Sequence, residues 1–193
     1  IGRGGLELPP GLLDGQKIDL LLERHALLAT TVDDFDSLGI PFRAVATDIV
    51  TGETVVLSGG NLATAIRASM SLPVIFAPRE VGGRLLVDGG VSCNLAIDVA
   101  REMGADIVIA VDISTPLQGR EDLRSLVSVT DQLTCLLTRR NTDLQIATLA
   151  GRDVFIRPEL GDIATGSFGR AAEAVPAGVA AAEAAGDRLD ALS

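Results

Sequence analysis

A single carboxylate at the end of an apolar strand is the sequence feature best suited to chemistry. The run Leu85-Leu86-Val87 leads directly into Asp88, and Gly89 and Gly90 follow it. Glycine lets the backbone turn tightly or approach a ligand closely, and the ligand sites of α/β proteins gather at strand ends. Asp-Gly is also common turn chemistry, so the alternative is a hairpin exit that Asp88 merely caps.

Other chemistries find little support in the residue types. His25 is the only histidine, and it falls on a predicted amphipathic helix, where we expect a partly exposed surface residue. Lys17 is the only lysine and is not in the Gly-Lys-Ser/Thr context of a P-loop. Cys93 and Cys135 fit neither a metal cluster nor a disulfide scaffold; free thiols are the default interpretation, and one isolated bridge between them stays open. We expect no metal and no cofactor.

The composition indicates one globular core. The chain has 193 residues, of which 47% are hydrophobic, which is ample for a packed interior. Aromatic residues make up only 3%, and the net charge is −10, so base stacking and attraction to phosphate backbones are both disfavoured. We expect no nucleic-acid partner. Apolar runs are too short for a membrane-spanning helix, and no signal peptide is visible.

The elements that must position Asp88 can be read from periodicity and turn signals. Residues 1–14 are rich in Gly and Pro and are predicted to be a loose lead-in without regular secondary structure. The elements expected after it are a helix over 16–28, a hairpin of strands 42–50 and 54–57, a helix over 62–71 capped by Asn61 and ended by Pro73, and a second hairpin around Gly82-Gly83 that runs into Asp88.

The second half of the chain alternates helices with short apolar strands. The elements expected there are a helix over 96–103 closed by Gly104, a strand over 106–111, a long helical stretch over 122–149, a strand over 154–156 and a terminal helix over 177–192. The strand over 106–111 is nearly continuously apolar, which is typical of a sheet covered on both faces. The fold class is therefore α/β, with a mixed sheet between helices.

Several motifs occur together in one order around Asp88. They are Ala46-Thr47-Asp48 with the turn Thr51-Gly52, Ala68-Ser69 in a helix that ends at Pro73, Phe76-Ala77-Pro78, and Asp88-Gly89-Gly90. This set resembles the patatin-like phospholipases, and most closely the patatin passenger domain of type V autotransporters. The resemblance covers residues 15–114, through Asn94, and continues more weakly to the end.

The resemblance implies a three-layer sandwich whose mixed central sheet has helices on both faces. It also implies a Ser-Asp dyad that hydrolyses acyl esters, with Asp88 as the general base and Gly89 and Gly90 supporting its loop. The nucleophile of that family lies on a Gly-x-Ser-x-Gly elbow, which neither Ser92 nor Ser167 completes. We therefore expect residues 1–193 to be the C-terminal portion of one such domain, inactive alone, with the serine and oxyanion loop on an upstream segment.

The resemblance also suggests residues around the base. Candidates for an acyl pocket are Ser69, Met70, Leu72 and Phe76, although apolar residues at helical spacing are more often plain core. Candidates for orienting the loop near Asp88 are Asp48 and Asn94, which could equally satisfy backbone groups at strand ends.

Partner and compartment expectations follow from the same family. The substrate would be a phospholipid or another acyl ester, met through transient apolar contact with a membrane surface, because the acidic charge weakens attraction to anionic lipids. We expect a secreted or cell-surface protein, with a cytoplasmic one as the alternative. Two other functions stay open: a non-catalytic lipid- or protein-binding module on the same fold, and an aspartic-protease-like use of Asp88 that would need a second such loop.

Overall fold

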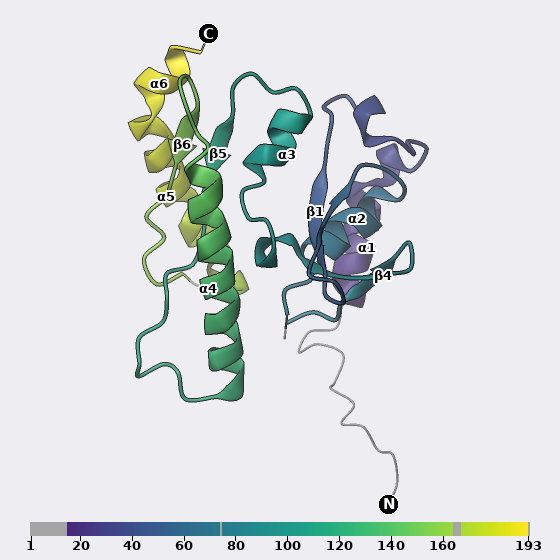
Figure 1. Ribbon diagram of the computed structural model, residues 1–193, viewed down its shortest axis with the longest axis horizontal. Helices are drawn as coiled ribbons and strands as arrows, with labels where there is room; N and C mark the ends of the chain where they lie inside the picture. The colour runs from purple at the N-terminus through teal and green to yellow at the C-terminus, as the bar shows by residue number, and fades with distance from the viewer. Residues whose placement is uncertain (1–14, 74, 164–166, 193) are drawn as a thin grey trace, which may run out of the picture. The chain divides into compact units, whose positions relative to one another are not determined.

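The computed structural model describes residues 15–73, 75–163 and 167–192, and the lead-in expected over 1–14 lies outside them. The chain divides into two compact units, one ending at Gly89 and the other running from Gly90 to Ser193. Helices and strands alternate along both, which confirms the α/β class (Figure 1). Each unit contains its own sheet.

The first unit is a four-stranded antiparallel sheet with helices packed against it. Its strands lie in the order β2-β1-β4-β3. They are β1 (Ala44–Asp48), β2 (Thr54–Leu57), β3 (Arg79–Val81) and β4 (Arg84–Asp88), and the helices are α1 (Gln16–His25) and α2 (Leu62–Ser69) with the 3-10 turns Leu27–Ala29 and Phe35–Ser37. Helix α2 packs on β1, β3 and β4, and α1 packs on α2.

The local sequence explains these elements well. The side chain of Asn61 accepts the N–H of Thr64 at 2.8 Å, so the predicted N-cap of α2 is confirmed. Gly82 and Gly83 both have positive φ, as the two-residue turn between β3 and β4 requires. Helix α1 ends at His25, three residues earlier than predicted, because the chain tightens into a 3-10 turn. His25 itself is exposed, as expected.

The core of the first unit is made of small side chains. Ala46, Ala68 and Leu86 are fully buried together and join β1, α2 and β4. A second cluster places Phe35 against Ala44 and Ala65. Alanine on both the helix and the strand lets their backbones lie close together, which is why a domain with few aromatic residues can still pack densely.

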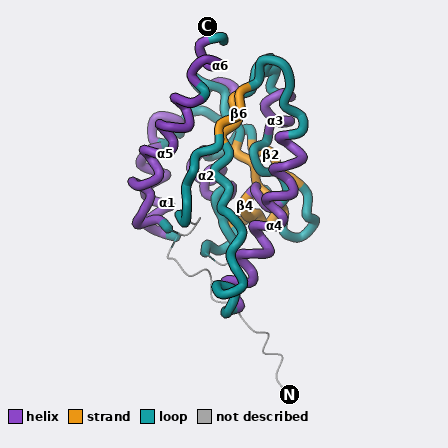
Figure 2. Tube along the Cα trace, turned by 90° about the vertical axis from the view of Figure 1, so that its left-hand side faces the viewer, coloured by secondary structure: helices purple, strands orange, loops and turns teal. Residues whose placement is uncertain are grey.

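The second unit has a parallel pair of strands and a long helix. Its elements are the 3-10 turn Gly89–Val91, α3 (Ile97–Glu102), β5 (Ile109–Val111), α4 (Leu126–Ile146), β6 (Val154–Ile156), the 3-10 turn Phe168–Arg170, α5 (Ala171–Ala184) and α6 (Gly186–Asp190). Helices α5 and α6 follow β6 to the end of the chain (Figure 2). Among the described helices, none combines the length and hydropathy needed to cross a bilayer.

Two sequence-based boundaries and one expectation about burial were wrong in this unit. Strand β5 begins at Ile109 rather than 106 because its partner β6 is only three residues long. Ile109 and Val111 are about half exposed, unlike the buried strand expected. The terminal helix begins at Ala171, so Pro176 lies inside α5 instead of preceding it. Both cysteines are free thiols, as predicted.

Asp153 joins the start of β6 to the rest of the second unit. Its carboxylate accepts the N–H groups of Ala150 and Val108, each at 2.9 Å, and two bonds from Arg101 at 2.6 and 2.5 Å. These backbone N–H groups, with the Arg101 guanidinium, outweigh burial and lower the pKa of Asp153 from 3.8 to about 2. The charged carboxylate therefore ties α3, β5 and β6 together.

We expect Asp153→Asn to destabilise the protein at neutral pH, because the amide presents N–H groups to donors. A carboxyl whose pKa is lower in the folded state stabilises it fully above its unfolded pKa and loses that contribution as pH falls through the folded pKa. The difference in urea midpoint between wild type and variant should therefore be constant above about pH 5 and shrink toward pH 2. The control Asp143→Asn, an exposed acid on α4, should show neither effect. A difference that does not change with pH would contradict this role.

Candidate active site

Asp88 ends β4, and its peptide group is held from two directions. Its N–H donates to the carbonyl of Ser71 at 2.9 Å. Its own carbonyl accepts the hydroxyl of Thr47 at 3.0 Å. Strand β3 pairs with β4 only as far as Leu86, so the Ser71 carbonyl takes the N–H that lies beyond the end of β3. The backbone of Asp88 is therefore fixed by the loop after α2 and by β1.

Antiparallel register places the side chain of Asp88 on the face that α2 covers. Asp88 lies opposite Ala46, and residues opposite one another in a sheet share a face. Ala46 packs against Ala68 of α2, so this is the helix-covered face. Asp88 is partly buried. A carboxylate at the edge of an alanine-lined core combines reduced solvation with access from outside, which suits a general base.

Gly89 passes so close to β1 that no side chain can stand there. A Cβ added at Gly89 would lie 2.3 Å from the carbonyl oxygen of Val45 and 2.7 Å from its carbon. That carbonyl oxygen also accepts the hydroxyl of Ser69 at 2.6 Å, so it cannot swing away freely. The first glycine of the motif is thus required by close approach to the backbone of β1, whereas the sequence suggested a tight turn or close approach to a ligand. Gly90 is buried and begins the second unit.

The four candidates for an acyl pocket lie around the end of α2. Ser69, Met70 and Leu72 are partly buried, and Phe76 is 2% exposed. The hydroxyl of Ser69 is used in its bond to Val45. The ring of Phe76 lies under the guanidinium of Arg67, 4.8 Å from Cζ to the ring centroid. Their role in binding an acyl chain stays a prediction, and the structure assigns Ser69 and Phe76 packing contacts of their own.

Asp48 organises the turn between β1 and β2. Its carboxylate accepts the N–H of Val50 at 3.0 Å, and its backbone bonds to Glu53 and Gly52. The register makes Asp48 a diagonal neighbour of Asp88 on the same face of the sheet. Its influence on Asp88 stays a prediction.

Asn94 belongs to the second unit and is bonded within it. Its amide donates to the hydroxyls of Thr142 at 2.7 Å and Ser114 at 3.3 Å. The next two residues, Leu95 and Ala96, have positive φ, a strained conformation for residues with side chains. Asn94 thus anchors a strained bend at the start of α3. Its proposed effect on Asp88 stays a prediction.

A second polar cluster closes the carboxyl ends of β5 and β6. Asp112 is buried; its carboxylate accepts the N–H and hydroxyl of Ser114 and both Nε and Nη2 of Arg157. Burial raises the pKa of Asp112, but the bonds from Ser114 and Arg157 outweigh it and hold the pKa below its usual range. The Asp112 carboxylate is thus engaged in bonds within the second unit.

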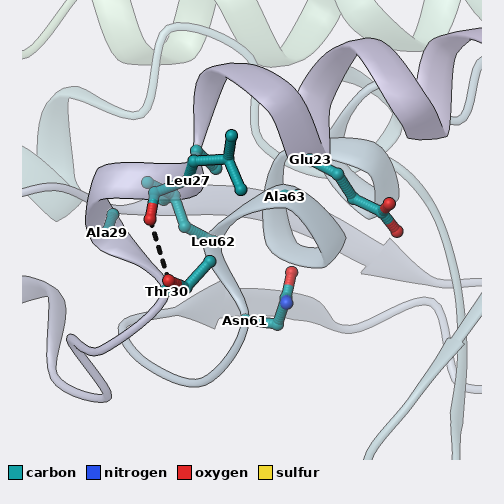
Figure 3. Close-up of a pocket in the computed structure, with 8 residues that line it drawn as sticks. Glu23, Leu27, Ala29, Thr30, Asn61, Leu62 and Ala63 are labelled. Carbon is teal, nitrogen blue, oxygen red and sulfur yellow. Dashed lines mark hydrogen bonds between the residues drawn. The ribbon is translucent and has the colours of Figure 1, made fainter.

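A small pocket in the first unit lies away from these candidates. It has a volume of about 230 Å³ and lies between α1, the following 3-10 turn and the start of α2 (Figure 3). Of its polar lining groups, Thr30 donates to Leu27 and Asn61 caps α2. None of the residues predicted for the site lines it. With only Glu23 left as an ionisable group, this pocket has no acid-base pair.

Sequence reasoning missed three residues that hold Asp88. Ser71 and Thr47 bond to its backbone, and Arg67 bonds to Ser71. Arg67 carried the only available signal, since it is the one charged residue in α2, whose other residues are small, apolar or uncharged. A charge in such a helix is normally exposed, and here it is 5% exposed.

We expect Gly89→Ala to destabilise the protein by about 1–3 kcal/mol, because its Cβ would overlap the Val45 carbonyl. Gly39→Ala is the matched control in the same unit, since nothing lies within 4 Å of its added Cβ. Its stability should change by less than about 1 kcal/mol. Urea unfolding of both variants measures the difference. Equal free energies of unfolding in the two variants would show that β4 can move away from β1 without destabilising the protein.

The region around Asp88 is similar in sequence to known proteins. The family model for patatin-like phospholipase matches residues 3–101, which include Asp48, Arg67 and the Asp88 loop. An uncharacterized NTE family protein of Mycobacterium bovis is 44% identical over 79 residues, 41% of this chain and 22% of that protein.

Two mammalian proteins are similar over a comparable stretch. Patatin-like phospholipase domain-containing protein 7 of Mus musculus is 43% identical over 84 residues, 42% of this chain and 6% of its own length. Patatin-like phospholipase domain-containing protein 6 of Homo sapiens is 38% identical over 102 residues, 51% of this chain and 7% of its own length. The matched stretch thus spans about a fifth of the mycobacterial relative and under a tenth of the mammalian ones. The family model matches residues 3–101, just over half of this chain. The chain therefore belongs to the patatin-like phospholipase family.

Proposed function

We propose that this chain is part of a lipid acyl hydrolase in which Asp88 is the general base. The observation that carries the proposal is the fixed peptide of Asp88, held by Ser71 and Thr47 at the end of β4, within the residues that match the family. A base must be held within hydrogen-bond reach of the proton it removes, and rigid placement on a strand end provides that.

The nucleophile of the proposed dyad is a serine on a segment upstream of Ile1. The described serines support this assignment, because Ser69 and Ser71 use their hydroxyls in bonds to backbone carbonyls. Neither Ser92 nor Ser167 stands in a Gly-x-Ser-x-Gly context. Asp88 would accept the proton of the upstream serine as that serine attacks the ester carbonyl, and would return a proton to the leaving alcohol.

A Ser-Asp pair suits the residue types of the chain. His25 is exposed at the end of α1, a helix that packs on α2. A carboxylate that takes the proton directly needs no imidazole between it and the serine. We propose that the substrate is a phospholipid or a related acyl ester, since the small and apolar groups beside Asp88 offer more to an acyl chain than to a charged head group.

We expect Asp88→Asn to lower ester hydrolysis by about 10²–10⁴-fold, because an amide cannot accept the proton. The assay uses the protein with its upstream segment and a short-chain acyl ester. Glu80→Gln, an exposed acid on β3 of the same sheet, is the matched control and should retain full activity. Thermal unfolding of both variants separates loss of chemistry from loss of fold.

A fluorophosphonate label on the same protein, followed by peptide mapping, tests the nucleophile. We expect one upstream serine to be labelled, more slowly in Asp88→Asn than in Glu80→Gln. Labelling at normal rate in Asp88→Asn, or full turnover by that variant, would remove Asp88 from the mechanism. Absence of any labelled serine would favour the binding module over the hydrolase.

A further inference from the structure

Arg67 is a buried arginine whose obvious ion pair does not account for its position. Its side chain is 6% exposed, and its Nε lies 3.2 Å from Oδ1 of Asp19 on α1. The geometry is not that of a hydrogen bond, and among the described residues neither atom has a hydrogen-bond partner. Arg79 of β3 reaches the other oxygen of Asp19 at 3.3 Å. Asp19 thus neutralises the charge without fixing the direction of the guanidinium.

The direction is fixed by Ser71. Nη1 of Arg67 donates to the Ser71 hydroxyl at 2.7 Å, and that hydroxyl donates to the backbone carbonyl of Arg67 at 2.9 Å. Ser71 is fully buried, so these bonds are shielded from water. Its own carbonyl then accepts the N–H of Asp88 at 2.9 Å. Two bonds therefore connect the guanidinium through Ser71 to the backbone of the proposed base, and a third, from the Ser71 hydroxyl to the Arg67 carbonyl, closes the turn.

Two further contacts hold the guanidinium plane. Its Cζ lies 4.8 Å from the centroid of the Phe76 ring, within range of a cation–π contact. On another side, a Cβ added at Gly15 would lie 3.0 Å from Nη2, so the chain entering α1 passes directly over the group. Only a planar, forked cation can stack on the ring and reach Ser71 at once, and lysine cannot do both.

We propose that Arg67 is a positioning residue for Asp88, acting through Ser71. The inference rests on the proposed function, in which Asp88 is the base. Arg67 fixes the turn after α2, this turn presents the Ser71 carbonyl, and that carbonyl sets how far the end of β4 lies from α2. A shift at Ser71 would therefore move the carboxylate relative to the attacking serine without removing any group that touches substrate.

The test compares two identical substitutions on the two partners of Asp19. In the protein with its upstream segment, Arg67→Lys keeps the charge but loses the fork, and should lower kcat about tenfold to hundredfold with KM unchanged. Arg79→Lys makes the same change in the other partner of Asp19, on β3, and should leave kcat unchanged. Equal kcat in the two variants, or a rise in KM alone, would overturn the proposal.

A double-mutant cycle with Ser71→Ala identifies the route. Ser71→Ala keeps the carbonyl that Asp88 uses but removes the hydroxyl that Arg67 holds. If Arg67 acts through this hydroxyl, the double variant should be no slower than the slower single variant. Losses that multiply would show that Arg67 acts by another path and would refute the relay. Because Ser71→Ala is a small change, it tests the same route should Arg67→Lys fold poorly.

Hydrogen exchange of the Asp88 amide keeps this proposal separable from the proposed function. Exchange should be faster in Arg67→Lys and Ser71→Ala than in wild type, and unchanged in Arg79→Lys. Should Asp88→Asn remain active, the assignment of the base fails, while the exchange rates still report on the relay. Should Asp88→Asn be inactive and the exchange rates be equal in all variants, the relay fails and the base remains.

Discussion

The approach of the Gly89 backbone to the Val45 carbonyl is the constraint on which the first unit depends. Two chain segments this close leave no room for a side chain, so the end of β4 can lie against β1 only with glycine there. The bonds of Thr47 and Ser71 to Asp88 require that closeness, because both partners belong to elements packed on the same stretch of sheet. The position of the Asp88 backbone is thus a consequence of this packing.

Small residues also determine how closely helix α2 packs on the sheet. Ala46 on β1 and Ala68 on α2 let the helix lie close to the sheet, and the turn that follows the helix can then reach the edge of β4. A larger residue at either position would lift α2 and withdraw the Ser71 carbonyl. The low aromatic content of the chain is therefore tied to the packing of the site.

Much of this could be predicted from the sequence, and the reasons for the exceptions are physical. Turn and cap chemistry is local, so the Asn61 cap, the Gly82-Gly83 turn and the strand that delivers Asp88 were all placed correctly. Strand length depends on a partner far along the chain, so β5 was predicted too long. The terminal helix was predicted to begin at 177, but it begins at Ala171 and retains Pro176 in its interior.

The partners of Asp88 were harder to predict than Asp88 itself. Ser71 acts through its carbonyl, which every residue has, so no residue type could mark it. Thr47 lies 41 positions away, and its contact depends on register. Arg67 is different, because burying a guanidinium is costly unless it is paired and hydrogen-bonded. The one charged residue on a helix that must face a sheet is therefore informative: here it identifies the turn that holds the Asp88 backbone.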